Sequence, residues 1–157
     1  LYGDGFAAGE IGHVVVDSNG PPCVCGNRGC LETFSSTRAL LQVVSAGSEH
    51  SILKWKDLVN AFATGDPHAK QLVQESGRYL GIAIANLIAA FNVHHIVLSG
   101  RVSQFGEAFL QAAQAEARQR ALPAMVDETT LSYSVLGADI VVLGSSALIL
   151  KHELGIV

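Results

Sequence analysis

The sequence is short of the features that mark secreted, membrane-spanning or nucleic-acid-binding proteins. It has only three cysteines, an odd number that cannot pair completely, and no signal-peptide pattern near its start, so we expect reduced thiols in a cytoplasmic protein. Its longest strongly apolar stretch, residues 80–91, is too short to cross a bilayer. The 10 basic and 14 acidic side chains leave a net charge of −4, which offers no basic field for DNA.

Apolar side chains are what the sequence has in quantity. Hydrophobic residues make up 49% of the chain and charged residues only 15%, which predicts one folded, well-buried domain over residues 1–157. The chain opens on Leu1 instead of methionine, and residues 2–9 have the composition of a loop interior. We therefore expect a fragment whose missing N-terminal sequence carries part of the function.

The most informative pattern combines the three cysteines with one histidine. His13, Cys23, Cys25 and Cys30 fall within 18 residues and match the Cys3His ligand set of a structural zinc ion. Such a closed tetrahedral shell leaves no position for a catalytic water, so the predicted zinc is structural. The alternative is three buried free thiols and a surface histidine, but the proline, glycine, asparagine and arginine between them are not typical of a core. We call residues 9–32 the metal loop.

The spacing of apolar residues predicts alternating strands and helices, and so an α/β layered domain. The expected strands are residues 11–16, 93–98 and 129–135. The expected helices are residues 31–47 and 55–63, a long helix opened by the capping pair Asp66-Pro67, a helix marked by Phe105 to Ala117, and a closing helix over residues 140–154. In the long helix Gly77 and Gly81 lie one turn apart, and each costs about 1 kcal/mol relative to alanine, which close helix packing would offset. Trp55 is expected in the core.

Two carboxylates flank the predicted metal ligands. Glu10 precedes His13 by three residues and Glu32 follows Cys30 by two, so a bound ion would draw them together. Carboxylates accept strong hydrogen bonds from the adjacent hydroxyls of a sugar, and the second ring nitrogen of a metal-bound histidine also takes a partner. The alternative is that Glu10 caps backbone amides and that Glu32 only favours the first turn of its helix.

Ser99-Gly100, at the end of the strand predicted over residues 93–98, is a candidate nucleotide contact. A glycine between a strand and a helix lets backbone approach a phosphate, although one glycine followed by Arg101 is equally typical of an ordinary turn.

The run Gly9-Glu10-Ile11-Gly12-His13, followed by Cys-Val-Cys-Gly-Asn-Arg-Gly-Cys-Leu-Glu over residues 23–32, resembles the signature of the ROK family of sugar-responsive repressors and sugar kinases. The segments at residues 86–92 and 96–100 are similar to the long helix and the nucleotide-side strand of that family. The resemblance covers essentially the whole chain, as the C-terminal half of a ROK protein.

The resemblance implies the C-terminal lobe of an actin-like ATPase fold of the hexokinase, Hsp70 and ribonuclease H-like type. It implies that Glu10, His13 and Glu32 contact a sugar or sugar phosphate. Zn2+ would be held by His13, Cys23, Cys25 and Cys30. The catalytic aspartate and the first phosphate-binding loop of ROK kinases belong to the N-terminal lobe, so no catalytic residue is assigned here and this fragment alone is not expected to be an enzyme.

Two departures from the kinase pattern and one similarity to repressors favour a regulator as the parent protein. Gly100-Arg101 replaces the Gly-Gly pair common in ROK kinases, residues 138–141 replace a small-residue turn, and residues 120–123 are similar to the N-acetylglucosamine and xylose repressors. We therefore predict a sugar-sensing, homodimeric domain of a transcriptional regulator that binds DNA only through a missing N-terminal helix-turn-helix.

Two other functions stay open. The first is the C-terminal lobe of an ATP-dependent sugar kinase, for which ATP would be the cofactor. The second is a zinc-stabilised interaction module without a ligand, which would require Glu10 and Glu32 to be remote from each other.

Overall fold

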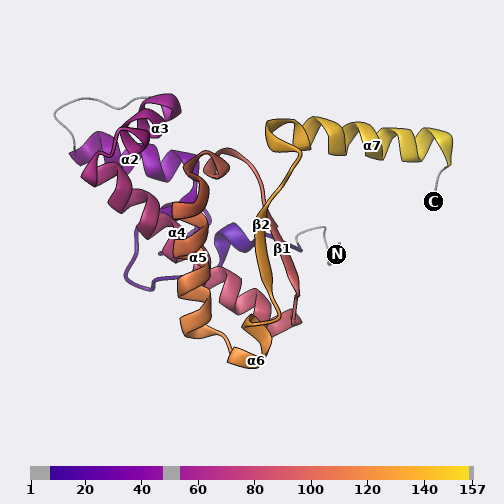
Figure 1. The fold of residues 1–157 in the computed structure, drawn as a ribbon, viewed down its shortest axis with the longest axis horizontal. Coiled ribbons are helices and arrows are strands. Elements are labelled where there is room, and N and C mark those ends of the chain that lie inside the picture. The colour runs from indigo at the N-terminus through magenta and orange to yellow at the C-terminus, as the bar shows by residue number, and fades with distance from the viewer. Residues whose placement is uncertain (1–7, 48–53, 156–157) are drawn as a thin grey trace.

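In the computed structural model, which describes residues 8–47 and 54–155, two long helices form the centre of the fold. Helices α4 (Pro67–Phe91) and α5 (Gly106–Arg120) lie side by side (Figure 1). Helix α4 begins where predicted, because Oδ1 of Asp66 accepts a hydrogen bond from the Ala69 amide at 2.7 Å and proline occupies the first turn. It ends at Asn92, which takes the left-handed conformation at φ 48°.

Glycines bring α4 and α5 into close contact, as the sequence predicted. A Cβ atom on Gly77 would lie 2.7 Å from the Phe109 carbonyl oxygen, and one on Gly81 would lie 2.7 Å from Cβ of Glu116. Both glycines are buried. Both glycines face α5 of the same chain, so they do not mark a surface between subunits.

A two-stranded parallel sheet covers one face of the helix pair. Strand β1 (His95–Leu98) pairs with β2 (Thr130–Tyr133) in the register His95 with Thr130 and Leu98 with Tyr133. The crossover between them contains η3 (Arg101–Phe105), α5 and the short helix α6 (Pro123–Val126). This is the strand, turn and helix unit expected for an α/β domain. Helix α6 was not predicted from the sequence.

A hydrophobic core joins the first half of the chain to this unit. Helix α2 (Thr37–Gly47) packs on α3 (Trp55–Ala63) and α4, and α3 packs on α4 and η3. The buried members of the cluster are Leu40, Trp55, Leu58, Ala69, Val73, Phe105 and Phe109. The prediction that Trp55 belongs to the core is confirmed.

Two expected elements of the N-terminal part are wrong. Residues 11–16 form no strand; Ile11–His13 is a short 3-10 helix (η2), and Val15 makes a single antiparallel bridge with Cys30. Val14 and Val15 are exposed, so their β-branched shape did not signal a buried strand. The helix expected over residues 31–47 is broken at Ser36, which is extended at ψ 153° and whose Oγ accepts from the Ala39 amide at 3.1 Å.

The break produces two helices, α1 (Glu32–Ser35) and α2. A serine that caps the helix following it offers the backbone an alternative to helix continuation, which explains the interruption.

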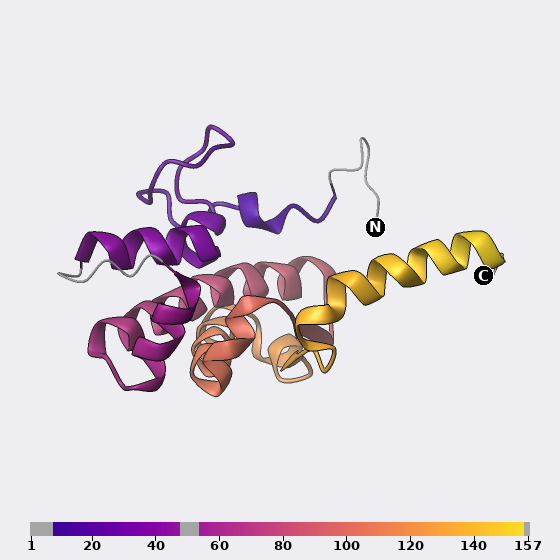
Figure 2. The ribbon, with the colours of Figure 1, turned by 90° about the horizontal axis from the view of Figure 1, so that it is seen from above.

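The final helix, α7 (Ile140–Leu154), has the predicted bounds but projects away from the rest of the chain (Figures 1 and 2). It follows the turn η4 (Gly137–Asp139). Its exposed apolar side chains are Val141, Val142, Leu143, Leu148, Ile149, Leu150 and Leu154. None of the helices within the described residues is both long and apolar enough to cross a membrane.

Candidate metal centre

Backbone hydrogen bonds fold the metal loop back on itself. The Val16 amide donates to the Gly29 carbonyl at 2.9 Å, and the Gly29 amide donates to the Pro21 carbonyl at 2.8 Å. Nearer the tip, the Cys23 amide donates to the Asn27 carbonyl at 2.8 Å. Gly29 has φ +68°, and a Cβ there would overlap the Asp17 carbonyl, so only glycine fits this reversal.

The folded loop gathers the four predicted metal ligands. One donor atom from each of His13, Cys23, Cys25 and Cys30 lies within 4.8 Å of the other three. Nδ1 of His13 is 3.5 Å from Sγ of Cys23, and the Sγ atoms of Cys25 and Cys30 are 3.6 Å apart. Donors around a tetrahedral zinc with thiolate bonds of about 2.3 Å stand about 3.7 Å from each other. The four residues therefore fit a tetrahedral metal ion.

Glu32 lies directly against this cluster. The Cys23 thiol donates to Oε1 of Glu32 at 2.9 Å, and the same oxygen is 3.7 Å from Nδ1 of His13. The structure thus brings two of the three predicted sugar-binding residues together. Glu10 is exposed immediately before η2, where its carbonyl accepts from the His13 amide at 3.1 Å. Convergence of its carboxylate with Glu32 stays a prediction.

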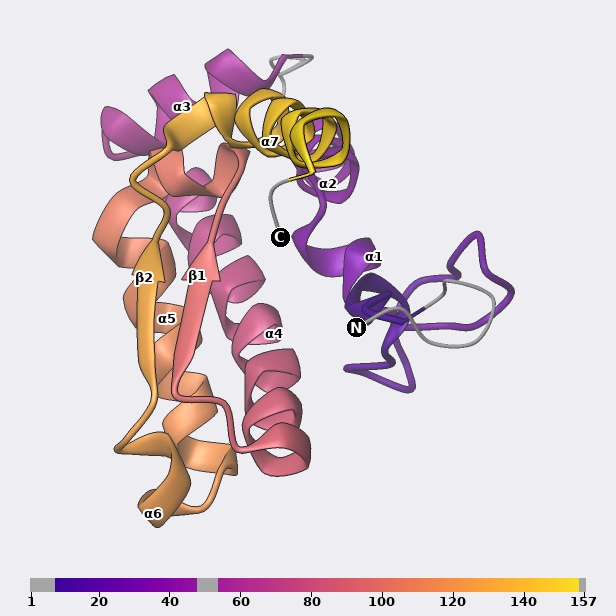
Figure 3. The same cartoon turned by 90° about the vertical axis from the view of Figure 1, so that its right-hand side faces the viewer.

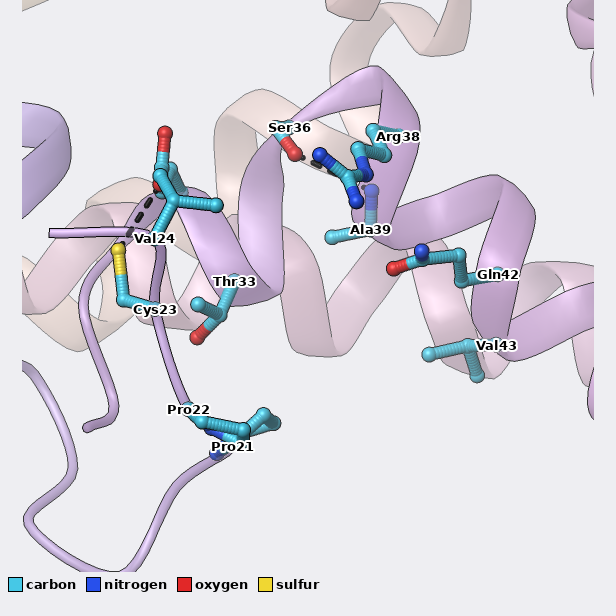
Figure 4. A pocket seen from close by; sticks show the side chains of 11 residues that line it. Pro21, Pro22, Cys23, Val24, Thr33, Ser36, Arg38, Ala39, Gln42 and Val43 are labelled. Carbon is cyan, nitrogen blue, oxygen red and sulfur yellow. Dashed lines mark hydrogen bonds between the residues drawn. The ribbon is translucent and has the colours of Figure 1, made fainter. Parts of the chain in front are cut away.

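A surface pocket opens beside Glu32, between the metal loop and α2 (Figure 4). Its walls are Pro21, Pro22, Cys23, Val24, Glu32, Thr33, Ser36, Arg38, Ala39, Gln42 and Val43. A small molecule held by Glu32 would therefore lie close to the metal cluster.

The three thiols have different acidities. The Cys25 amide lowers the pKa of Cys23, but the Glu32 carboxylate, burial and the neighbouring thiols outweigh it and raise that pKa to about 12. Hydrogen bonding from the Asn27 amide, followed by that from Cys23, lowers the pKa of Cys25 to about 7. Burial raises the pKa of Cys30. Binding of a metal requires all three thiolates, so protons must leave when the ion enters.

An aromatic contact that the sequence analysis missed joins α1, which begins at the last residue of the metal loop, to α4. The rings of Phe34 and Tyr79 stack with their centroids 3.8 Å apart, and the Tyr79 hydroxyl donates to Oδ2 of Asp17 at 3.4 Å. Next to them, Oγ of Ser35 donates to the Ser76 carbonyl at 2.9 Å. Each residue is unremarkable in sequence, and only the fold places positions 45 residues apart in contact.

Ser99 and Gly100 lie at the end of β1, where the sequence placed them. Gly100 has φ +91°, and its carbonyl accepts from Oγ of Ser103 at 2.8 Å. This turn and the metal loop lie on different sides of α4 (Figure 3). A nucleotide contact at this turn stays a prediction.

Comparison with known proteins agrees with the fold. The chain belongs to the ROK family, whose model matches residues 1–152. It is 34% identical to a glucokinase of Halalkalibacterium halodurans over 98% of this chain and 51% of the relative. It is 33% identical to a xylose repressor of Bacillus spizizenii over 98% of this chain and 39% of the relative.

A solved structure extends the likeness to three dimensions. A ROK-family glucokinase from Streptomyces griseus, in complex with glucose and AMPPNP, matches with a TM-score of 0.75 and 26% identity over 91% of this chain and 51% of that one. The α/β fold is therefore that of the sugar kinases of the family. The chain spans about half the length, or less, of the curated relatives it matches, and these include both repressors and kinases.

Proposed function

We propose that this chain is the sugar-binding and dimerisation lobe of a ROK transcriptional regulator, built around a structural zinc ion. The observation that carries the proposal is the meeting of four metal-ligating atoms with the Glu32 carboxylate. The xylose repressor among its relatives supports the sugar and the regulatory role.

Zinc is the ion that the donor set favours. Three thiolates and one imidazole suit Zn2+, whereas magnesium and calcium prefer oxygen ligands. When bound, the ion ties the two ends of the metal loop together and leaves no open position for chemistry. Its role in the proposal is to hold His13 and Glu32 in place.

Metal binding would also prepare the sugar contact. Without an ion, the Cys23 thiol donates a hydrogen bond to the Glu32 carboxylate. A thiolate bound to zinc has no proton to give, so the Glu32 carboxylate becomes available to accept hydrogen bonds from sugar hydroxyls. Nδ1 of His13 faces Cys23, which leaves Nε2 free to contact the same ligand. Glu10 would supply the third contact.

The turn after β1 favours a regulator over a kinase. Arg101 is exposed next to Gly100, at the place where ROK kinases, by the resemblance, carry a second glycine beside the nucleotide. A long cationic side chain at that position would obstruct adenosine. The alternative, a lobe of an ATP-dependent sugar kinase, is favoured by the glucokinase relative at 34% identity. A homodimer is proposed because a repressor reads two half-sites.

The test is sugar titration of the full-length gene product by calorimetry, with a panel of aldoses that includes glucose and xylose. Glu10→Gln and Glu32→Gln should each weaken binding about ten-fold to a hundred-fold, because each removes one charged hydrogen-bonding partner. Zinc content should stay the same.

The matched control is Glu75→Gln, which changes an exposed carboxylate on α4 that accepts a hydrogen bond from Nε2 of Gln71 at 3.1 Å. Equal affinities for all variants would contradict the sugar site. ADP release that depends on both sugar and ATP would decide for the kinase alternative.

A further inference from the structure

We propose that Cys25 is an oxidation site, and that its reaction with a hydroperoxide joins it to Cys30 in a disulfide and expels the metal ion. The inference rests on the proposed zinc site for the last step only. The oxidation itself depends on the arrangement of thiols within the metal loop.

The three thiols differ in their access to solvent. Cys25 is exposed, whereas Cys23 and Cys30 are buried, and Cys30 has no accessible surface. A hydroperoxide from solution therefore reaches Cys25 first. Exposure is one of the main determinants of which cysteine in a protein is oxidised.

Geometry selects Cys30 as the partner of the oxidised sulfur. Sγ of Cys30 is 3.6 Å from Sγ of Cys25, so a short movement brings the two sulfurs to bonding distance. The Cys23 thiol is instead directed at Oε1 of Glu32, at 2.9 Å. Gly26, at φ +94° and with open space around it, lies between the reacting residues and can absorb the backbone adjustment.

The reaction balances with hydrogen peroxide as the oxidant. The Cys25 thiolate attacks one peroxide oxygen, the O–O bond breaks, Cys25 becomes a sulfenic acid, and the departing hydroxide is neutralised by a proton from the buffer to give water. The Cys30 thiolate then attacks the Cys25 sulfur, the S–O bond breaks, and a second hydroxide leaves and is protonated. Two thiolates, one peroxide and two protons thus become one disulfide and two waters.

Disulfide formation removes two of the four metal ligands. His13 and Cys23 alone do not complete the tetrahedral shell that zinc requires, so the ion leaves. Reduction of the disulfide by a thiol returns both ligands and allows the site to reload. The metal loop would therefore exist in a closed, metal-bound form and an oxidised, metal-free form.

Trypsin provides a direct assay, because Arg28 lies between the two cysteines. In the reduced protein the peptide ending at Arg28, which contains Cys23 and Cys25, separates from the peptide Gly29–Arg38, which contains Cys30. After oxidation of the full-length gene product with hydrogen peroxide, the two peptides should appear as one linked species by mass spectrometry. A disulfide between Cys23 and Cys25 would stay within the first peptide and would overturn the assignment.

Two serine variants identify which cysteine of the first peptide is joined to Cys30. In metal-free protein, with folding checked by circular dichroism, Cys23→Ser should still give the linked species and Cys25→Ser should give none. Fragmentation of the wild-type linked species across Val24 provides the same answer if either variant fails to fold. Linked peptide in Cys25→Ser at the wild-type yield would overturn the proposal.

Metal release is measured separately, with a chromophoric chelator and protein whose zinc content is known beforehand. One zinc should leave for each disulfide formed, and dithiothreitol with added zinc should restore the original content. Zinc release without a linked species would overturn the proposal. Protein that binds no zinc but still forms the link would count against the zinc site and not against the oxidation of Cys25.

Discussion

In the α4–α5 pair, glycines allow two helices to touch because they carry no side chain. In the metal loop, glycines instead adopt backbone angles that let the chain reverse direction. Gly77 and Gly81 have helical angles and are surrounded by atoms of α5, whereas Gly26 and Gly29 have φ of +94° and +68°. The first region is held by apolar burial around Phe109 and its neighbours. The same amino acid therefore serves packing in one region and chain direction in the other.

The two regions also differ in what completes them. The core that holds the helix pair is formed by residues of α2, α3, α4, η3 and α5 of the same chain. The metal loop has few buried apolar residues of its own and gathers three thiols and an imidazole that could hold a metal ion. Perturbations of the metal should therefore act on the loop, and perturbations of packing on the helices.

Metal removal should have the largest effect. If zinc binds only the folded chain, saturation at about 1,000 times its dissociation constant stabilises the protein by about 4 kcal/mol. Thermal unfolding followed by circular dichroism should show a lower Tm after chelation, and tryptic cleavage after the exposed Arg28 should become faster. Zinc should restore both properties and magnesium neither. An unchanged Tm with zinc demonstrably lost would show that the loop does not depend on the ion.

Gly81→Ala should come next, with a loss of about 1–3 kcal/mol. The added Cβ would lie 2.7 Å from Cβ of Glu116, and this overlap exceeds the gain of about 1 kcal/mol that alanine brings to a helix. Gly144→Ala is the matched control, because α7 leaves open space there and the variant should gain up to about 1 kcal/mol. Urea unfolding measures the free energy of unfolding of both variants. Zinc content should not change in either variant, and a stable Gly81→Ala would refute the close packing.

Tyr79 variants should have the smallest effect and test the contact between the two regions. Tyr79→Phe keeps the stack on Phe34 and loses only the hydrogen bond to Asp17, whereas Tyr79→Leu loses both. The leucine variant should be about 0.5–1.5 kcal/mol less stable than the phenylalanine variant. Its zinc affinity should also fall, as measured by competition with a chelator. Identical zinc affinity in the two variants would mean that the stack does not position the loop.

Local chemistry made much of this molecule predictable. Asp66-Pro67 fixed the start of α4, and Gly77 and Gly81 correctly indicated close helix packing. The cluster of His13 with the three cysteines followed from their spacing, because ligands so close in sequence can be gathered by a single loop. Sequence patterns that span only a few residues can therefore be interpreted without knowledge of the fold.

What could not be predicted depends on contacts between distant residues. The apolar run at residues 11–16 has strand composition, but no strand of the described part of the chain pairs with it, and it forms η2 and one bridge. The contact of Phe34 with Tyr79 joins positions whose sequence neighbourhoods are unrelated. For α7 the sequence predicted the helix but not its exposure, since an apolar pattern does not state whether a partner is present.

The position of the only tryptophan gives the molecule an optical reporter for one of its regions. Trp55 is buried against Phe105 at a centroid distance of 5.1 Å, and its indole N–H donates to Oε1 of Gln104 at 2.6 Å. Its fluorescence therefore reports the helical core, while the metal loop contains no tryptophan. Emission should stay constant while a chelator opens the loop, and should shift to longer wavelength only when the core itself admits water.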